Sequence, residues 1–150
     1  MNVGENQAED ALKWWKSIFK DDYYLELNRH GEEEDEIVNK VLLKFSKNYS
    51  VKVVATNTSK YINKEDANAH DILLCVKDGE KQSTPIGKGR NFRYGLKNQE
   101  YYFKNSDEMN KLFKDIPEAI ANIKEIVEKV DFYDLNRDVL LPKFTIPNDF

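Results

Sequence analysis

The pattern of apolar and polar positions predicts helices that alternate with short strands. Apolar residues recur at helical spacing over 8–19 and again over 32–48. The runs at 23–27 and 51–56 are too short for helices and are rich in aromatic and aliphatic residues, as strands are. The run at 51–56 is nearly continuous, which is typical of a strand covered on both faces. Strands separated by helices pair in parallel, so this half of the chain indicates an α/β fold.

Helix boundaries can be predicted for the segment after the second predicted strand, 51–56. Asn63 and Asp66 have the spacing of a short capping box, which predicts that a helix begins there. That helix is expected to end near Gly79, because glycine is common just after the last helical residue. Ser106 is in position to cap a further helix over 107–113.

The C-terminal part of the chain is predicted to contain a short strand at 100–103 and one more helix. Asp115 and Glu118 have capping-box spacing at the start of that helix. Beyond Asp131 two prolines indicate an extended segment that crosses a surface. The buried stripe of the helix is expected to be Ile120, Ile123, Val127 and Val130.

Composition narrows the class of protein without giving its function. The 150 residues are 40% hydrophobic and 33% charged, which suits one folded domain. The formal net charge of −4 argues against a globally basic nucleic-acid binder, although a local basic patch is compatible with it. The single cysteine, Cys75, excludes an internal disulfide and fits a reducing compartment. Because no apolar run is long enough for a membrane span or a signal sequence, we expect a cytoplasmic protein without membrane contact.

Two polar residues, Glu26 and His30, lie at the end of the first predicted strand and in the turn after it. Sites form at the carboxyl edge of parallel strands in α/β folds, so this pair could bind a metal or a partner. A turn held by hydrogen bonds from His30 explains the same pattern, and we favour it. With two histidines and one cysteine, a metal site of nitrogen and sulfur ligands would also need carboxylates.

The segment 79–99 is predicted to be a long loop that is both basic and aromatic. Cations interleaved with aromatic rings can contact a phosphate backbone and stack on bases, so DNA contact is one interpretation. Docking of a solvated loop onto another domain is the other interpretation, and we favour it. The glycines of the loop do not match a nucleotide-binding P-loop. The candidate contact residues are Lys88, Arg90, Phe92, Arg93 and Tyr94.

Several motifs, in order along the chain, resemble the alpha subunit of bacterial DNA polymerase III. The first two are Tyr-Leu-Glu-Leu-Asn-Arg-His-Gly at 24–31 and Val-Val-Ala-Thr-Asn at 53–57. Each motif is short, but their order and spacing hold over 8–150, and the loop at 82–99 looks like the form in Bacteroidetes-type versions. Later motifs include Glu65-Asp66-Ala67, Ala69-His70-Asp71, Leu73-Leu74-Cys75, Tyr101-Tyr102-Phe103-Lys104, Ile116-Pro117-Glu118-Ala119 and Leu141-Pro142-Lys143-Phe144.

The resemblance implies a fragment of a larger polymerase. Residues 1–131 resemble the C-terminal half of the family's PHP (polymerase and histidinol phosphatase) domain, a distorted (β/α) barrel with parallel strands and flanking helices. Residues 132–150 resemble an extended exit segment toward the polymerase core. A partial barrel explains why so few strands are predicted. The implied activity of the parent is DNA-directed DNA synthesis with Mg²⁺, whereas this piece is expected to be non-catalytic and to hold no cofactor.

One motif departs from the pattern of the family. Metal-binding PHP domains carry Asn-Asp-x-His-Tyr after the strand, and the corresponding stretch here is Asn-Thr-Ser-Lys-Tyr at 57–61. Thr58 therefore takes the place of the aspartate and Lys60 that of the histidine. Threonine is a poor metal ligand, and a lysine ammonium has no lone pair to donate. The resemblance thus predicts a degenerate, silent metal site, with an active metal-dependent phosphoesterase as the alternative.

The expected role of the piece is structural. The resemblance implies that it completes the PHP barrel, packs against other domains of the parent polymerase and presents a surface to the proofreading exonuclease subunit. DNA would be a partner through the parent chain. In isolation the piece is expected to expose strand edges and apolar surface and therefore to oligomerise. A DNA-binding module that acts through loop 79–99 is the remaining alternative.

Overall fold

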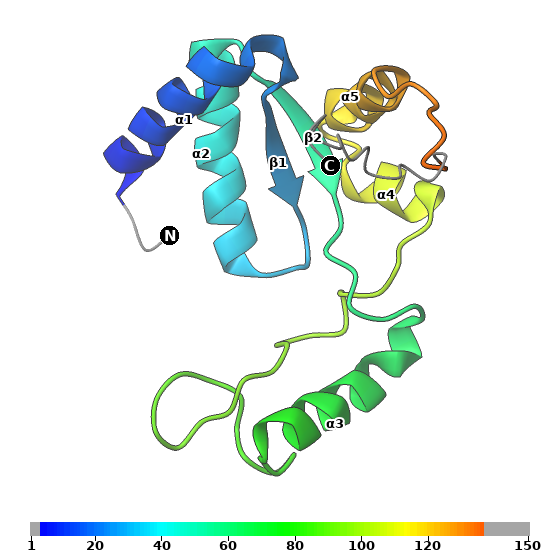
Figure 1. Ribbon diagram of the computed structural model, residues 1–150. Coiled ribbons are helices and arrows are strands. Elements are labelled where there is room, and N and C mark those ends of the chain that lie inside the picture. Colours follow the sequence, from blue (N-terminus) through cyan, green and yellow to red (C-terminus); the bar gives the residue numbers. More distant parts are fainter. Residues whose placement is uncertain (1–3, 137–150) are drawn as a thin grey trace, which may run out of the picture.

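The computed structural model describes residues 4–136 as a body and an arm (Figure 1). The body comprises residues 5–56 and 104–128, and the arm comprises residues 57–103. In the body, α1 (Glu5–Phe19) and the 3-10 turn η1 (Lys20–Asp22) precede β1 (Tyr24–Asn28), and α2 (Glu33–Tyr49) precedes β2 (Lys52–Thr56). The arm holds the 3-10 turn η2 (Lys64–Asp66) and α3 (Ala67–Asp78), and the chain returns to the body with α4 (Ser106–Leu112) and α5 (Pro117–Glu128).

β1 and β2 pair in parallel, as the alternation of helices and strands predicts. Leu25 is opposite Val53 and Leu27 is opposite Ala55 in the register of the two strands. Among the described residues the sheet contains only these two strands. The fold is therefore an open, mixed helix-and-strand arrangement that is compatible with a partial α/β fragment, and the barrel stays a prediction.

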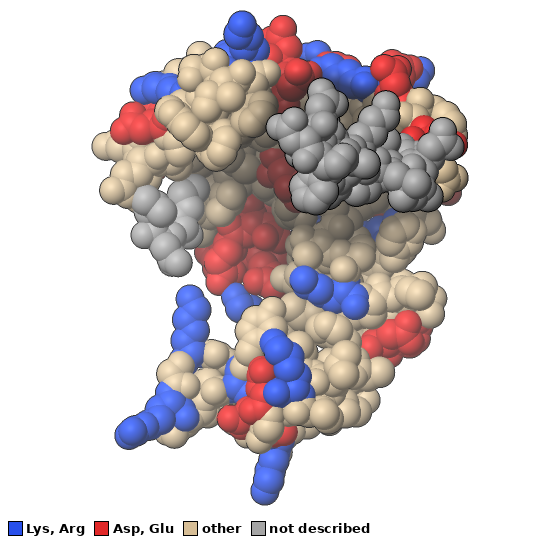
Figure 2. All heavy atoms as spheres, in the orientation of Figure 1, with Lys and Arg blue, Asp and Glu red and all other residues tan. Residues whose placement is uncertain are grey.

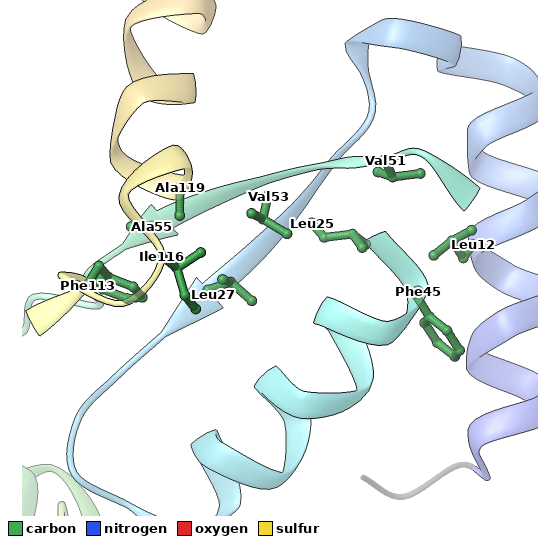
Figure 3. Close-up of a cluster of buried hydrophobic side chains, with 10 residues drawn as sticks. All are labelled: Leu12, Leu25, Leu27, Phe45, Val51, Val53, Ala55, Phe113, Ile116 and Ala119. Atoms are coloured by element: carbon green, nitrogen blue, oxygen red, sulfur yellow. The ribbon is translucent and has the colours of Figure 1, made fainter. Parts of the chain in front are cut away.

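The hydrophobic core lies on one face of this sheet, between the strands and the helices α1, α2 and α5 (Figure 3). Because side chains alternate along a strand, the odd-numbered strand residues share the covered face. Burial of each large aliphatic or aromatic side chain there stabilises the fold by about 1.5–3 kcal/mol. The buried cluster consists of Leu12, Leu25, Leu27, Phe45, Val51, Val53, Ala55, Phe113, Ile116 and Ala119.

α5 covers the outer edge of β2. The Asn122 side-chain amide donates a hydrogen bond of 2.8 Å to the carbonyl oxygen of Val53. This carbonyl faces away from β1, since alternate residues of a parallel pair direct their backbone groups to opposite edges. The contact satisfies an edge acceptor that would otherwise invite another strand.

Two expectations for the segments around α4 are corrected by the structure. Residues 100–103 form no strand, and only an isolated parallel bridge joins Tyr102 to Tyr61. The cap of α4 is Asn105 and not Ser106. The Asn105 side chain accepts from the Glu108 N–H at 3.0 Å, and the Glu108 carboxylate accepts from the Asn105 N–H at 2.8 Å. By contrast, the predicted capping box of Asn63 and Asp66 is present.

The expected start of α5 is also wrong, and its expected buried stripe is only partly confirmed, because Ile120 packs against the core cluster. Asp115 makes no capping box, because its carboxylate pairs with Arg29 instead. Ala119 is the buried residue of this helix, whereas Val127 is 64% exposed and Val130 is 68% exposed. The apolar periodicity is present, but among residues 4–136 only its N-terminal part is covered.

The chain exposes more surface than a compact protein of its mass. Its accessible area is 12095 Å², against about 7,900 Å² expected for a folded monomer of 17.6 kDa. Exposed apolar side chains gather on α1 and on α3, and no helix of the described part has the length and apolar character to cross a membrane. Residues 132–136 are exposed and without regular structure, and the rest of the predicted exit segment, 137–150, lies outside the described residues.

Candidate functional site

The uncovered face of the sheet ends in a small polar network at the carboxyl edge of both strands. Glu26 of β1 accepts a hydrogen bond from the Thr56 hydroxyl of β2 at 2.5 Å and one from the Asn28 amide at 2.9 Å. These two hydrogen bonds, first that of Thr56, lower the pKa of Glu26. The orientation of the carboxylate is therefore fixed by both strands. The network arises because the register places residues 26, 28, 54 and 56 on the same face.

The two residues at the altered metal motif lie next to this network. The Thr58 hydroxyl is 3.3 Å from the Asn28 side-chain oxygen, to which it can donate. Lys60 is exposed, and its backbone N–H donates to the Tyr101 carbonyl at 2.7 Å. This hydrogen bond joins the segment that leaves the body to the segment that returns to it. Within residues 4–136, no three His, Cys, Asp or Glu side chains gather as a metal site would require.

A buried lysine fixes the start of the arm. The Lys104 ammonium lies 3.4 Å from the Asn57 side-chain oxygen, contacts the Glu100 carbonyl, and stands 4.3 Å from the centre of the Tyr102 ring. Burial lowers the pKa of Lys104, while the Glu100 carboxylate opposes that shift. The Asn57 amide in turn donates to the Tyr102 carbonyl at 2.7 Å. The side chain of Asn57, which directly follows β2, is thus engaged in structural hydrogen bonds.

The other two candidates, Glu26 and His30, have different surroundings. His30 is buried, its ring stacks on Tyr101 with centroids 4.2 Å apart, and its backbone N–H donates to Asp35 at 2.8 Å. Its Nδ1 is 3.5 Å from the same Asp35 oxygen, and its buried Nε2 has no partner among the described residues. Glu26, in contrast, is exposed on the open face of the sheet. The geometry around His30 is that of a hydrogen-bonded turn.

The turn at His30 also contacts residues 97–101, where the chain returns from the arm to the body. The Asn98 amide donates to the His30 carbonyl at 2.7 Å, and the Tyr101 hydroxyl donates to Glu32 at 2.7 Å. Lys97 pairs with Glu34 at 2.7 Å and with Glu32 at 3.3 Å. Figure 2 shows acidic side chains gathered between the body and the arm. No role was assigned to the acidic start of α2 from the sequence, although the cations of the loop are a signal that acidic partners are needed.

In the basic loop 79–99, some side chains are fixed by contacts with the rest of the arm and others are exposed. Arg93 is buried, and its guanidinium pairs with Asp71 of α3 at 2.6 and 2.9 Å. The Phe92 ring packs on Gly87, where an added Cβ would lie 2.5 Å from a ring carbon. Of the five candidate contact residues, Arg93 is therefore turned inward. The other four, Lys88, Arg90, Phe92 and Tyr94, are exposed.

The fold and this site define a partial α/β segment. The polar side chains at the carboxyl ends of its two strands form hydrogen bonds mostly with one another. Comparison with known proteins relates the chain to one kind of protein. It is 40% identical over 149 residues to the DNA polymerase III subunit alpha of Borreliella burgdorferi and 37% identical over 126 residues to that of Campylobacter jejuni. It is 35% identical over 150 residues to that of Aquifex aeolicus. No family model matches the chain.

These matches cover 97%, 84% and 95% of this chain, but only 12%, 10% and 13% of the relatives' own lengths. The resemblance found in the motifs is thereby confirmed. The chain is similar, over nearly its whole length, to a small part of bacterial DNA polymerase III alpha subunits.

Proposed function

We propose that the chain is a structural segment of a replicative DNA polymerase, and that the parent protein adds deoxynucleotides to a primer with Mg²⁺ held outside this segment. The observation that carries the proposal is the match of nearly the whole chain to polymerase alpha subunits. The parent is proposed to work in the cytoplasm, where the Cys75 thiol stays reduced. Primer extension by the purified parent protein tests the activity, and its absence under polymerase conditions would overturn the proposal.

Within that protein, the segment is proposed to be the C-terminal half of a PHP domain with a silent metal site. The hydroxyl of Thr58 lies against Asn28 and the ammonium of Lys60 repels a divalent cation, so neither favours metal binding. The test is metal analysis of the full-length polymerase after expression with zinc and manganese. Tightly bound stoichiometric metal, or a metal-stimulated phosphoesterase activity, would instead support the active alternative.

A matched variant sharpens this test. The double substitution Thr58→Asp and Lys60→His restores the ligand types of the metal-binding motif. We expect it to raise metal retention by the full-length polymerase only if the remaining ligands of the site are intact. Asn48→Asp, at an exposed position of α2 away from the motif, serves as the control for added negative charge.

The scaffold role is supported by the apolar surface that the segment leaves uncovered. On α1, Trp14 is 56% and Trp15 is 42% exposed, and on α3 Leu73 is 63% exposed. Exposed apolar area of this extent marks interaction surfaces. We propose that other polymerase domains, and the proofreading exonuclease subunit, cover part of it. The isolated chain should then self-associate.

Hydrogen exchange tests this role directly. The backbone amides of α1 and α3 are compared in the isolated 150-residue chain, in the full-length polymerase, and in the polymerase bound to the exonuclease subunit. Slower exchange in the longer protein is expected where domains cover these helices, and further slowing marks the subunit. Equal exchange in all three samples would contradict the scaffold role.

A second candidate function is DNA contact by the loop 79–99. The ion pair between Arg93 and Asp71 favours it. This pairing fixes the base of the loop and leaves Lys88 and Arg90 exposed at the tip. Each phosphate contact should steepen the fall of affinity with salt by about 0.7 in a plot of log affinity against log salt. Single-stranded DNA binding by the polymerase is therefore compared with that of Lys88→Ala and Arg90→Ala. The matched control is Lys40→Ala and Lys47→Ala on α2, and equal salt slopes would remove this candidate.

A further inference from the structure

The tip of the long loop, residues 85–93, is a turn held by its own backbone. The N–H of Arg93 donates to the Pro85 carbonyl at 3.0 Å. Inside this pair, the Phe92 N–H donates to the Gly89 carbonyl at 3.2 Å, which is the hydrogen bond of a four-residue turn. These two hydrogen bonds give the loop tip a defined backbone path, although the rest of the loop has no regular structure.

The loop tip carries an aromatic ring that is both held in place and exposed. A Cβ added to Gly87 would lie 2.5, 2.9 and 3.1 Å from the Phe92 ring atoms Cδ1, Cγ and Cε1. These distances leave no room for a side chain at 87, so the glycine lets the ring lie close to the backbone. Phe92 is nevertheless 47% exposed. A positioned aromatic ring that remains open to solvent is a surface on which a second flat ring can stack.

The charged side chains of the loop tip are cations without acidic partners. Lys88 and Arg90 are exposed, and neither pairs with a carboxylate among the residues that the structure describes, whereas Arg93 is neutralised by Asp71. Figure 2 shows Lys and Arg side chains that project into solvent from the lower part of the molecule, where the arm lies. Because the whole chain has a net charge of −4, this positive charge is a local feature. It is complementary to an anionic partner.

We propose that the loop tip binds unpaired nucleotides, with a base stacked on Phe92 and neighbouring phosphates paired with Lys88 and Arg90. This site rests on the proposed contact of the loop with DNA, and it specifies which form of DNA and which groups are bound. In a duplex, neighbouring bases cover each base face, so only a single strand offers a face to the ring. Every base has a π face, so the site should tolerate any sequence. Residues 88–91 are Lys, Gly, Arg and Asn, and the lack of apolar neighbours disfavours a protein surface as the occupant.

Photo-crosslinking tests the stacking in the full-length polymerase. The probe is a single-stranded oligonucleotide that carries 5-iodouracil, a base that crosslinks on irradiation to aromatic side chains in contact with it. Mass spectrometry then locates the crosslinked residue. We expect a crosslink at Phe92 that excess single-stranded DNA suppresses and excess duplex DNA does not. Phe103, which is 70% exposed elsewhere in the arm, is the control for exposure alone and should not crosslink.

A pair of glycine variants tests whether the position of the ring matters. Gly87→Ala keeps Phe92 but pushes its ring away from the backbone, and it should lower the crosslink yield by about fivefold or more. Gly4→Ala is the matched control, because a Cβ added there meets nothing within 4 Å, and it should leave the yield unchanged. Equal yields from the two variants would contradict a stacking site that depends on the Gly87 contact.

The remaining outcomes separate this site from the broader DNA contact. If Lys88→Ala and Arg90→Ala reduce the salt dependence of DNA binding but no crosslink forms at Phe92, the loop contacts phosphates only and the stacking site is wrong. If neither effect is seen, both the stacking site and the DNA contact are wrong. Equal suppression by duplex and single-stranded DNA would exclude selection of unpaired nucleotides. Slow amide exchange over 85–93 without DNA, together with no crosslink, would assign the loop tip to a protein surface and overturn the proposal.

Discussion

Arg93 and Asp71 form a bidentate ion pair that joins the long loop to α3. The two guanidinium–carboxylate distances are 2.6 and 2.9 Å, and the Arg93 Nε–H also donates to the Thr84 carbonyl at 2.8 Å. The guanidinium holds the pKa of the Asp71 carboxyl below its usual range. The Arg93 side chain therefore connects two parts of the loop, at residues 84 and 93, with α3.

Replacement of Arg93 should release the loop without unfolding the body. Arg93→Lys keeps the charge but loses the bidentate geometry, and Arg93→Ala leaves Asp71 without this partner. We expect amide exchange over 82–95 to increase by about tenfold in the alanine variant and less in the lysine variant. Arg90→Ala, at an exposed position of the same loop, is the control. Equal exchange in Arg93→Ala and Arg90→Ala would show that the ion pair does not hold the loop.

A second ion pair gives a dependence of stability on pH. Arg29 donates to both oxygens of Asp115, at 2.6 and 2.8 Å, and lowers the pKa of Asp115 to about 2 from an ordinary value of 3.8. Because the folded-state pKa is depressed, the stabilisation is present above the ordinary value and is lost as pH falls from about 4 to about 2. Asp115 is 55% exposed in its side chain, so solvent screening reduces the effect.

We therefore expect Asp115→Asn to lower the free energy of unfolding by about 1 kcal/mol at pH 7. The variant and the original chain should converge near pH 2, where the original carboxyl is protonated too. Urea unfolding at several pH values measures the difference. Asp131→Asn, at an exposed carboxylate after α5, is the control. A difference that stays constant down to pH 2 would contradict this assignment.

The edge of β2 gives a prediction about association. Asn122→Ala removes the donor to the Val53 carbonyl and should lower the free energy of unfolding by about 1 kcal/mol. The uncovered edge should also raise the sedimentation coefficient at high concentration. Asn110→Ala, on the exposed side of α4, makes the same chemical change away from the sheet. If both variants behave alike, the edge contact has no special role.

The junction of body and arm can be tested at Tyr101. Burial and the hydrogen bond to Glu32 both raise the pKa of Tyr101. Tyr101→Phe removes only that hydrogen bond and should cost about 1 kcal/mol. Tyr101→Leu also removes the stacking on His30 and should cost about 1 kcal/mol more. Urea unfolding measures both, with the exposed Tyr133→Phe as control, and equal effects of the two Tyr101 variants would exclude a contribution from stacking.

Local patterns predicted most elements of the fold. α1, α2, β1 and β2 agree with the expected bounds to within a few residues, because apolar periodicity reports directly on helix and strand. Gly79 ends α3 as expected, with a φ of 68°. The predicted buried stripe of α5 is only partly confirmed, because Ile120 packs against the core and Ile123, Val127 and Val130 are exposed. Spacing shows that one side of a helix is apolar, but it does not show which part of the protein covers that side.

The candidate site was less predictable, because its contacts join residues far apart in sequence. Thr56 and Glu26 are linked through the strand register, which no local motif specifies. The composition of the loop showed a cluster of cations, yet it could not distinguish the inward-turned Arg93 from the exposed Arg90. The partner of Arg93 is 22 positions away, on a helix whose orientation only the fold determines.

The contact between Asn122 and Val53 has a consequence for how this sheet can be enlarged. At the border along β2, Asn122 of α5 takes the Val53 carbonyl, and the opposite border, along β1, pairs with no strand among residues 4–136. A strand added along β2 would have to compete with Asn122 for that carbonyl, whereas a strand added along β1 would not meet this contact. The two borders of the sheet therefore differ in how readily they accept a neighbour.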